Sequence, residues 1–156
     1  MNRLMSLGWF AVLTAITAPV VADLRDAEEA IEYRQSVYKA IKWHMDPMTA
    51  MVRGDIDYDA VRLTRHAQNV HALSEMLIEG FVPGSDLGAY QGVTGARSEI
   101  WERWEEFEEK MGALNEQSQA LVIASTSGDM RGNIRPAFAA LGQACKSCHD
   151  EFRQRR

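Results

Sequence analysis

The segment Cys145-Lys146-Ser147-Cys148-His149, near the end of the 156-residue chain, constrains the fold more than any other feature. It reads C-x-x-C-H, the pattern of covalent c-type haem attachment. Two thiols one helical turn apart can add to the two vinyl groups of one haem, and the adjacent imidazole can then ligate the iron. The chain has only two cysteines. The motif therefore predicts one haem c per chain, bound through Cys145 and Cys148, with His149 on the iron.

A disulfide and a thiol-disulfide oxidoreductase site are the alternatives for this motif. A redox C-x-x-C pair is expected near a helix N-terminus that follows a strand. Here Cys145 and Cys148 fall near the end of a long helical pattern, in a chain whose sequence has no strand pattern. Haem attachment is therefore the favoured interpretation, and a haem-free helical bundle is the rival from a different class.

The first 22 residues have the pattern of a removable leader. Arg3 supplies a positive charge, an apolar run of about 14 residues follows, and small residues end the segment at Ala22. This run is shorter than the roughly 20 residues that span a bilayer. We expect residues 1–22 to be a signal peptide and residues 23–156 to form one domain, located in the periplasm and not inserted in the membrane. A membrane anchor is the alternative.

The charge of the chain excludes one class of partner. It has 17 basic and 22 acidic side chains, and loss of Arg3 with the leader leaves a net charge of −6. A protein that binds nucleic acid needs a basic surface for the phosphates. We therefore expect no nucleic-acid partner.

Apolar residues recur at intervals of three and four along the mature sequence, which predicts four amphipathic helices. The first ends at Gly54 and contains Pro47, where we expect a kink or a local break. The second covers about residues 58–79, a glycine-rich loop follows, and the third starts near Ser98. Asp129 is the expected N-cap of the fourth. The predicted fold is an all-α antiparallel four-helix bundle.

The register of the fourth helix places the haem. Cys145 and Cys148 share the apolar stripe of that helix with Ile134, Phe138 and Leu141. The haem should therefore lie in the bundle core.

The sixth iron position separates an electron carrier with two protein ligands from a haem with one open side. The first helix should face the haem with Arg34, Tyr38 and Ile41, none of which is a usual haem c ligand. Met45 and Met48 are the candidate ligands of a low-spin carrier, although methionines at helical spacing are more often core residues. The remaining histidines, at positions 44, 66 and 71, favour surface or dimer-face roles.

Four segments together resemble the cytochrome c' family: Tyr33-Arg34-Gln35, the stretch from Gly54 to Ala60, Glu99-Ile100-Trp101, and the stretch from Gly142 to Arg153. The resemblance covers essentially the whole mature chain. It implies a periplasmic bundle, usually a homodimer, with a five-coordinate high-spin haem. Such a haem binds nitric oxide and carbon monoxide and can exchange single electrons with a redox partner protein. No substrate turnover is implied.

The resemblance also implies a set of residues around the haem. Arg34 and Gln35 would lie near the haem propionates or the distal rim, and Thr94 and Gly95 would approach from the loop before the third helix. Arg153, one turn after the expected iron ligand, would be the arginine of the proximal side.

Tyr38 stands where the family presents a side chain to the open face of the iron. In low-spin relatives a methionine ligand comes from this part of the first helix, and here the position is tyrosine. A neighbouring semi-apolar face has two interpretations, packing against another helix or contact with a second copy; it is formed by Tyr33, Val37, Ala40 and His44.

Overall fold

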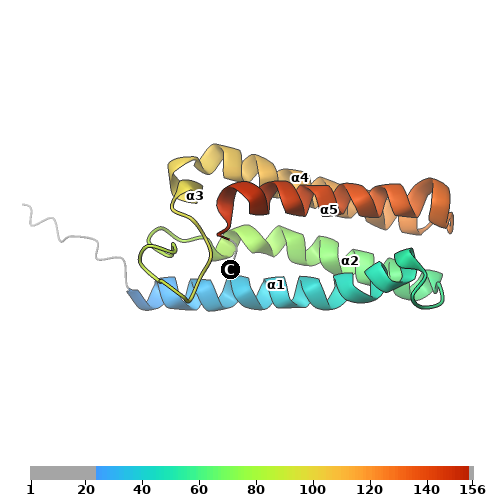
Figure 1. Cartoon of the computed structure of the whole chain (residues 1–156), viewed down its shortest axis with the longest axis horizontal. Helices are drawn as coiled ribbons and strands as arrows, with labels where there is room; N and C mark the ends of the chain where they lie inside the picture. The colour runs from blue at the N-terminus through green and yellow to red at the C-terminus, as the bar shows by residue number, and fades with distance from the viewer. Residues whose placement is uncertain (1–23, 155–156) are drawn as a thin grey trace, which may run out of the picture.

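The computed structural model describes residues 24–154, so the predicted signal peptide lies outside the described part of the chain. Helices run alternately in opposite directions along one long axis (Figure 1). The elements are α1 (Leu24–Arg53), α2 (Ala60–Met76), the 3₁₀ turn η1 (Leu77–Gly80), α3 (Glu99–Glu102), α4 (Trp104–Ser125), the π-helical turn η2 (Met130–Ile134) and α5 (Arg135–Phe152). The predicted four-helix bundle is confirmed, with α3 and α4 together forming the third helix.

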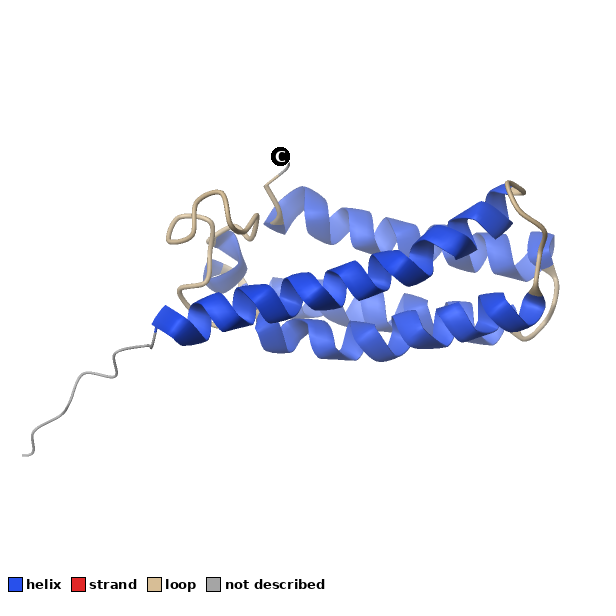
Figure 2. Cartoon of the chain, turned by 90° about the horizontal axis from the view of Figure 1, so that it is seen from below, coloured by secondary structure: helices blue, strands red, loops and turns tan. Residues whose placement is uncertain are grey.

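The four helices close the bundle along three seams and leave the fourth open. Helix α1 packs on α2, α2 packs on α4, and α4 packs on α5, whereas α1 and α5 make no comparable contact. The α1–α2 and α4–α5 connections lie at one end of the bundle. The long loop over residues 81–98 and the C-terminus lie at the other end (Figures 1 and 2). The loop therefore stands next to the last turn of α5, which carries the C-x-x-C-H motif.

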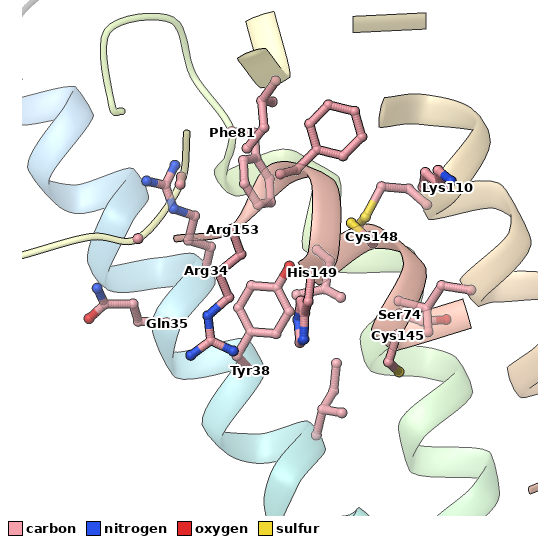
Figure 3. Close-up of a pocket in the computed structure, with 18 of the residues that line it drawn as sticks. Arg34, Gln35, Tyr38, Ser74, Phe81, Lys110, Cys145, Cys148, His149 and Arg153 are labelled. Carbon is pink, nitrogen blue, oxygen red and sulfur yellow. The ribbon is translucent and has the colours of Figure 1, made fainter. Parts of the chain in front are cut away.

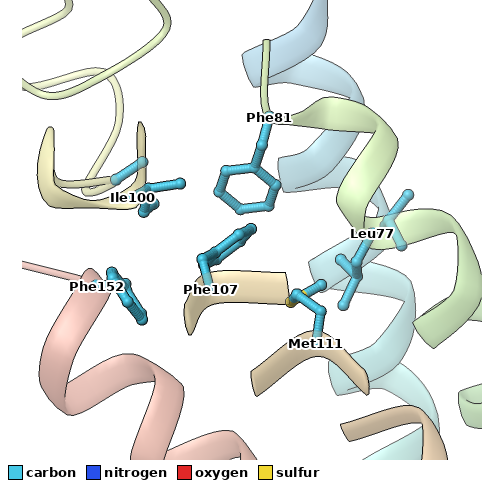
Figure 4. Close-up of a cluster of buried hydrophobic side chains, with 8 residues drawn as sticks. Leu77, Phe81, Ile100, Phe107, Met111 and Phe152 are labelled. Atoms are coloured by element: carbon cyan, nitrogen blue, oxygen red, sulfur yellow. The ribbon is translucent and has the colours of Figure 1, made fainter. Parts of the chain in front are cut away.

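The core has two parts, one for each half of the bundle. The half nearer the loop is largely aromatic (Figure 4). In it the Phe107 ring lies 4.7 Å from that of Phe81 and 5.4 Å, edge to face, from that of Phe152, measured between centroids. The other half is aliphatic and includes Met48, Leu63, Leu121 and Leu141. Aromatic rings prefer edge-to-face contacts of this kind, and these contacts stabilise the loop end of the core beyond the burial of apolar area.

Two local predictions differ from the structure. Of the kink or local break expected at Pro47, the break is wrong, because α1 continues as a helix through this residue to Arg53. Burial of the neighbouring Met48 and Met51 compensates for the single backbone donor that proline lacks. The third helix is interrupted at Arg103, whose φ of −127° and ψ of 49° are not helical.

The capping prediction for Asp129 is confirmed, since its carboxylate accepts from two backbone N–H groups.

Within residues 24–154, none of the helices is long and apolar enough to cross a bilayer.

Candidate haem site

A cavity of about 610 Å³ lies where α1 faces α5 across the open seam. This volume falls within the range of about 300–1,000 Å³ that is usual for cofactor sites. All nine residues that the sequence and the resemblance pointed to line it, namely Arg34, Gln35, Tyr38, Thr94, Gly95, Cys145, Cys148, His149 and Arg153 (Figure 3). Residues separated by more than 100 positions in the sequence thus meet in one place.

Helix α5 presents the two thiols to this cavity. Their spacing of three residues puts Cys145 and Cys148 on the same face of the helix, both are half-buried, and both are free thiols. Burial raises the pKa of both thiols, that of Cys148 to about 11. Both thiols are therefore protonated at neutral pH. They stand one helical turn apart, which is the spacing that thioether bonds to a single haem require.

His149 and Tyr38 face each other across the cavity from α5 and α1 (Figure 3). Their ring centroids lie 6.3 Å apart, with the ring planes inclined by 60°. Burial, followed by the positive charge of Arg153, lowers the pKa of His149 and favours the neutral imidazole that ligates metals. Burial raises the pKa of Tyr38, so its phenol is protonated.

Arg34 holds the long loop on α1. The side chain is only 2% exposed. Its Nη1 donates to the carbonyl of Gly80 at 2.9 Å and to Oγ of Ser85 at 2.7 Å, while Nη2 donates to the carbonyl of Ser85 and to Oγ1 of Thr94 at 3.0 Å. The guanidinium also lies over the ring of Phe81, 4.8 Å from its centroid. Burial lowers the pKa of Arg34 to about 10, which leaves it charged at neutral pH.

Gly80 makes this approach of the backbone to Arg34 possible. A Cβ at position 80 would lie 2.6 Å from the Cβ of Arg34, which is closer than two carbon atoms can come without displacement. Three of the arginine's four hydrogen bonds are thus directed to the loop and one to Gly80, a set of partners that its position on an apolar stripe did not reveal.

The loop crosses from α1 to α5 over the end of the cavity. On the α1 side, Nε2 of Gln35 donates to the carbonyl of Val93 at 2.7 Å. On the α5 side, the carbonyl of Gly95 accepts from the backbone N–H of Gln154 at 2.8 Å, and Ala96 pairs with Arg153 in a single antiparallel bridge. The loop therefore connects α1 and α5, which contact each other less than the other neighbouring pairs of helices do.

Several further residues of the cavity wall were not among the sequence candidates. Ser74, Met111, Lys110 and Lys39 line the cavity, and Nζ of Lys110 lies 2.7 Å from a carboxylate oxygen of Glu151. Lys110 follows Phe107 by three residues, so helical periodicity could have placed it on the inner face. Its charge argued for the surface instead.

The two methionines considered as iron ligands occupy different environments. Met45 lines the cavity. Met48 is fully buried in the aliphatic half of the core and does not reach the cavity wall.

The face considered for contact with a second copy is only partly covered by the chain itself: Val37 is buried, whereas Tyr33, Ala40 and His44 are half-buried. The hydroxyl of Tyr33 donates to the Glu79 carboxylate at 2.8 Å, and Val37 is buried in the aromatic half of the core. Nδ1 of His44 lies 2.9 Å from Nδ1 of His66 on α2. Part of this face therefore packs against the neighbouring helix α2 and the η1 turn that follows it.

The residues of the cavity fit a covalently held haem. Two free thiols share one face, a neutral imidazole follows them, and apolar side chains form most of the wall. The cavity wall also carries Arg153 and Lys39, positive side chains of the kind that can pair with anionic propionates. The gap between the rings of His149 and Tyr38 gives a flat macrocycle an imidazole on one face and a phenol ring on the other.

Comparison with known proteins gives one consistent answer. The family model described as cytochrome c' matches residues 29–153. The cytochrome c' of Halomonas halodenitrificans is 38% identical over 129 residues, covering 82% of this chain and 98% of the relative.

Solved structures agree with this match. Cytochrome c prime from Shewanella frigidimarina superimposes with a TM-score of 0.77 at 39% identity, covering 83% of this chain and 97% of that one. A cytochrome c prime variant from Alcaligenes xylosoxidans, solved as a nitric oxide complex, superimposes with a TM-score of 0.74 at 32% identity, with the same coverage.

Proposed function

Because the chain belongs to the cytochrome c' family and carries haem c, we propose that it is a periplasmic monohaem protein that reversibly binds nitric oxide and carbon monoxide. In this proposal the haem is five-coordinate and high-spin, exchanges single electrons with a partner protein, and turns over no substrate. When bound, the haem supplies an iron with one vacant coordination position.

The chain's own residues would hold the haem from both sides. Cys145 and Cys148 would form the thioether bonds, and His149, on the same helix, would be the axial ligand. Arg153 and Gln35 would pair with the propionates at the cavity mouth, and Thr94 and Gly95 would cover the edge through the loop. Arg34 would act mainly on the position of that loop, because its Nη donors are directed to loop atoms and to Gly80.

The observation that carries the proposal is that Tyr38 is the side chain facing His149. A buried, protonated phenol is a poor iron ligand when an imidazole is already present, and its ring occupies the space that a ligand must enter. Distal polarity and steric access decide which molecules a haem binds. A bulky ring over a vacant position favours small diatomic ligands.

Absorption spectra of the ferric and ferrous protein, with and without nitric oxide and carbon monoxide, test this proposal. We expect high-spin spectra in both oxidation states and a large change of the ferrous spectrum with either gas. A sharp low-spin ferrous alpha band that carbon monoxide leaves unchanged would contradict the five-coordinate assignment.

Replacing Tyr38 by alanine should speed ligand entry. Removal of the ring takes away the group that has to move, so the association rate of carbon monoxide should rise at least about tenfold, equivalent to lowering the barrier by about 1.4 kcal/mol. Flash photolysis of the ferrous complex measures this rate. Tyr38→Phe keeps the ring and loses only the hydroxyl, so it should bind at the wild-type rate. Equal rates for Tyr38→Ala and wild type would show that the ring does not restrict access.

A low-spin carrier with a methionine ligand is the second candidate, because Met45 lines the cavity. It lies seven residues beyond Tyr38, about 10 Å along α1, whereas it is Tyr38 that stands opposite the imidazole. We therefore expect Met45→Leu to leave the ferric and ferrous spectra unchanged. Conversion from a low-spin to a high-spin spectrum in this variant would establish Met45 as the sixth ligand. Met48→Leu, in the core away from the cavity, is the matched control.

The outer surface of the α1–α2 pair is the proposed contact of a homodimer. Trp43 on α1 and Val61 on α2 are 74% and 75% exposed and offer apolar area to a second copy. The half-buried residues Tyr33, Ala40 and His44 of α1 belong to the same proposed contact. Sedimentation equilibrium should show a dimer for wild type. The double variant Trp43→Glu, Val61→Glu should sediment as a monomer.

A further inference from the structure

A pair of histidines outside the haem cavity faces each other across the α1–α2 seam. His44 on α1 and His66 on α2 are half-buried, with ring centroids 5.2 Å apart and ring planes inclined by 47°. Their Nδ1 atoms are 2.9 Å apart and hydrogen-bonded to each other, so that the two rings share one proton. Neither residue lines the cavity, and the proposed function gives neither a role.

The spacing of the two nitrogens matches a particular metal geometry. With metal–nitrogen bonds of about 2.0–2.1 Å, two ligands at a right angle are about 2.9 Å apart, and two tetrahedral ligands about 3.3–3.4 Å apart. The observed 2.9 Å fits the right-angle arrangement. Square-planar and tetragonal coordination by nitrogen is typical of Cu(II) and Ni(II), and Cu(II) binds such ligands more tightly.

We propose that His44 and His66 form a two-histidine site for a divalent transition metal ion, Cu(II) in the first place, bound through the two Nδ1 atoms. Both ligands are presented by long helices that pack on each other, so the site is largely formed before the ion arrives. Among residues 24–154 no third histidine, cysteine or carboxylate completes a cluster with them. Solvent therefore occupies the remaining positions, and the ion is exchangeable.

The type of ligand, and not the surrounding charge, favours an ion that binds through imidazole nitrogen. Both ligands are imidazole nitrogens, which Cu(II) and Ni(II) accept, whereas Mg²⁺ and Ca²⁺ need oxygen ligands. The nearby Arg62 and Arg65 weaken the binding of any divalent cation, so only an ion with a strong preference for nitrogen is expected to bind.

Titration of the holoprotein with CuCl₂ in a non-coordinating buffer at pH 7.5, followed by calorimetry, tests the proposal. We expect one ion per chain, and electron paramagnetic resonance should show hyperfine splitting from two nitrogens. His44→Ala and His66→Ala should each weaken Cu(II) binding at least about tenfold, since loss of groups around a metal ligand already costs 10–100-fold. If alanine disturbs the packing of α1 on α2, the copper affinity of His44→Gln is measured instead, because glutamine can still hydrogen-bond to His66.

His71→Ala is the matched control. His71 is also a half-buried histidine on α2, but its Nδ1 lies 2.9 Å from Oγ of Ser118 and not near a second imidazole. Copper binding by this variant should equal that of wild type. Absence of Cu(II) binding by wild type, wild-type affinity in either His44→Ala or His66→Ala, or a loss of affinity in His71→Ala would overturn the proposal.

Discussion

Replacing both Cys145 and Cys148 by serine should abolish covalent haem attachment completely. Both free thiols face the cavity from one side of α5, and the chain contains no other cysteine that could replace them. The intact-mass spectrum of the exported double variant should lack the added mass of haem, and acid acetone should extract any haem that remains. Each single variant should retain one thioether bond, with the pyridine haemochrome band shifted accordingly.

Ser147→Ala is the control for this experiment. Ser147 lies between the two cysteines, but its hydroxyl donates to the carbonyl of Ala144 within the helix. Its loss should leave attachment at the wild-type level. Haem that stays bound to the double variant through acid extraction would rule out the cysteines as its attachment points.

Replacing Arg34 by alanine should be the most destabilising change outside the cysteines. It would leave the carbonyls of Gly80 and Ser85 and the hydroxyls of Ser85 and Thr94 without their donor. A buried polar group that loses its partner costs about 1–3 kcal/mol. A total of about 3 kcal/mol or more is therefore expected, with a fall in Tm of about 10 °C for a domain of this size.

Thermal unfolding of the holoprotein, followed by circular dichroism, measures the effect. Arg34→Lys keeps the charge but cannot reproduce the forked set of hydrogen bonds. Its Tm should therefore lie between that of wild type and that of Arg34→Ala. Arg135→Ala removes an exposed arginine at the start of α5 and should change Tm by no more than about 2 °C. A wild-type Tm in Arg34→Ala would mean that other contacts hold the loop.

The parts of the structure that follow from local periodicity were predicted from the sequence. The apolar stripes gave the number and order of the helices, and the position of Cys145 and Cys148 on one of these stripes placed the thiols inside the bundle. The cap at Asp129 was predictable because it depends on a few neighbouring residues. These features need only the geometry of one helix.

The features that depend on two distant segments were not predictable in this way. Pro47 has a strong local tendency to interrupt a helix, and tertiary packing of its neighbours overrides it. The pairing of His44 with His66 requires the relative register of two helices, which periodicity does not supply. The partners of Arg34 lie 46 to 60 residues away, at the end of η1 and in the irregular loop that follows it.

Burial of the two thiols has a consequence for the order of events in biogenesis. Thiol addition needs the thiolate or an accessible thiol, and burial raises the pKa of both cysteines, that of Cys148 to about 11. In the closed bundle the thiols are thus half-buried and protonated. Attachment of haem is therefore expected to be faster before α1 and the loop close over the cavity than after.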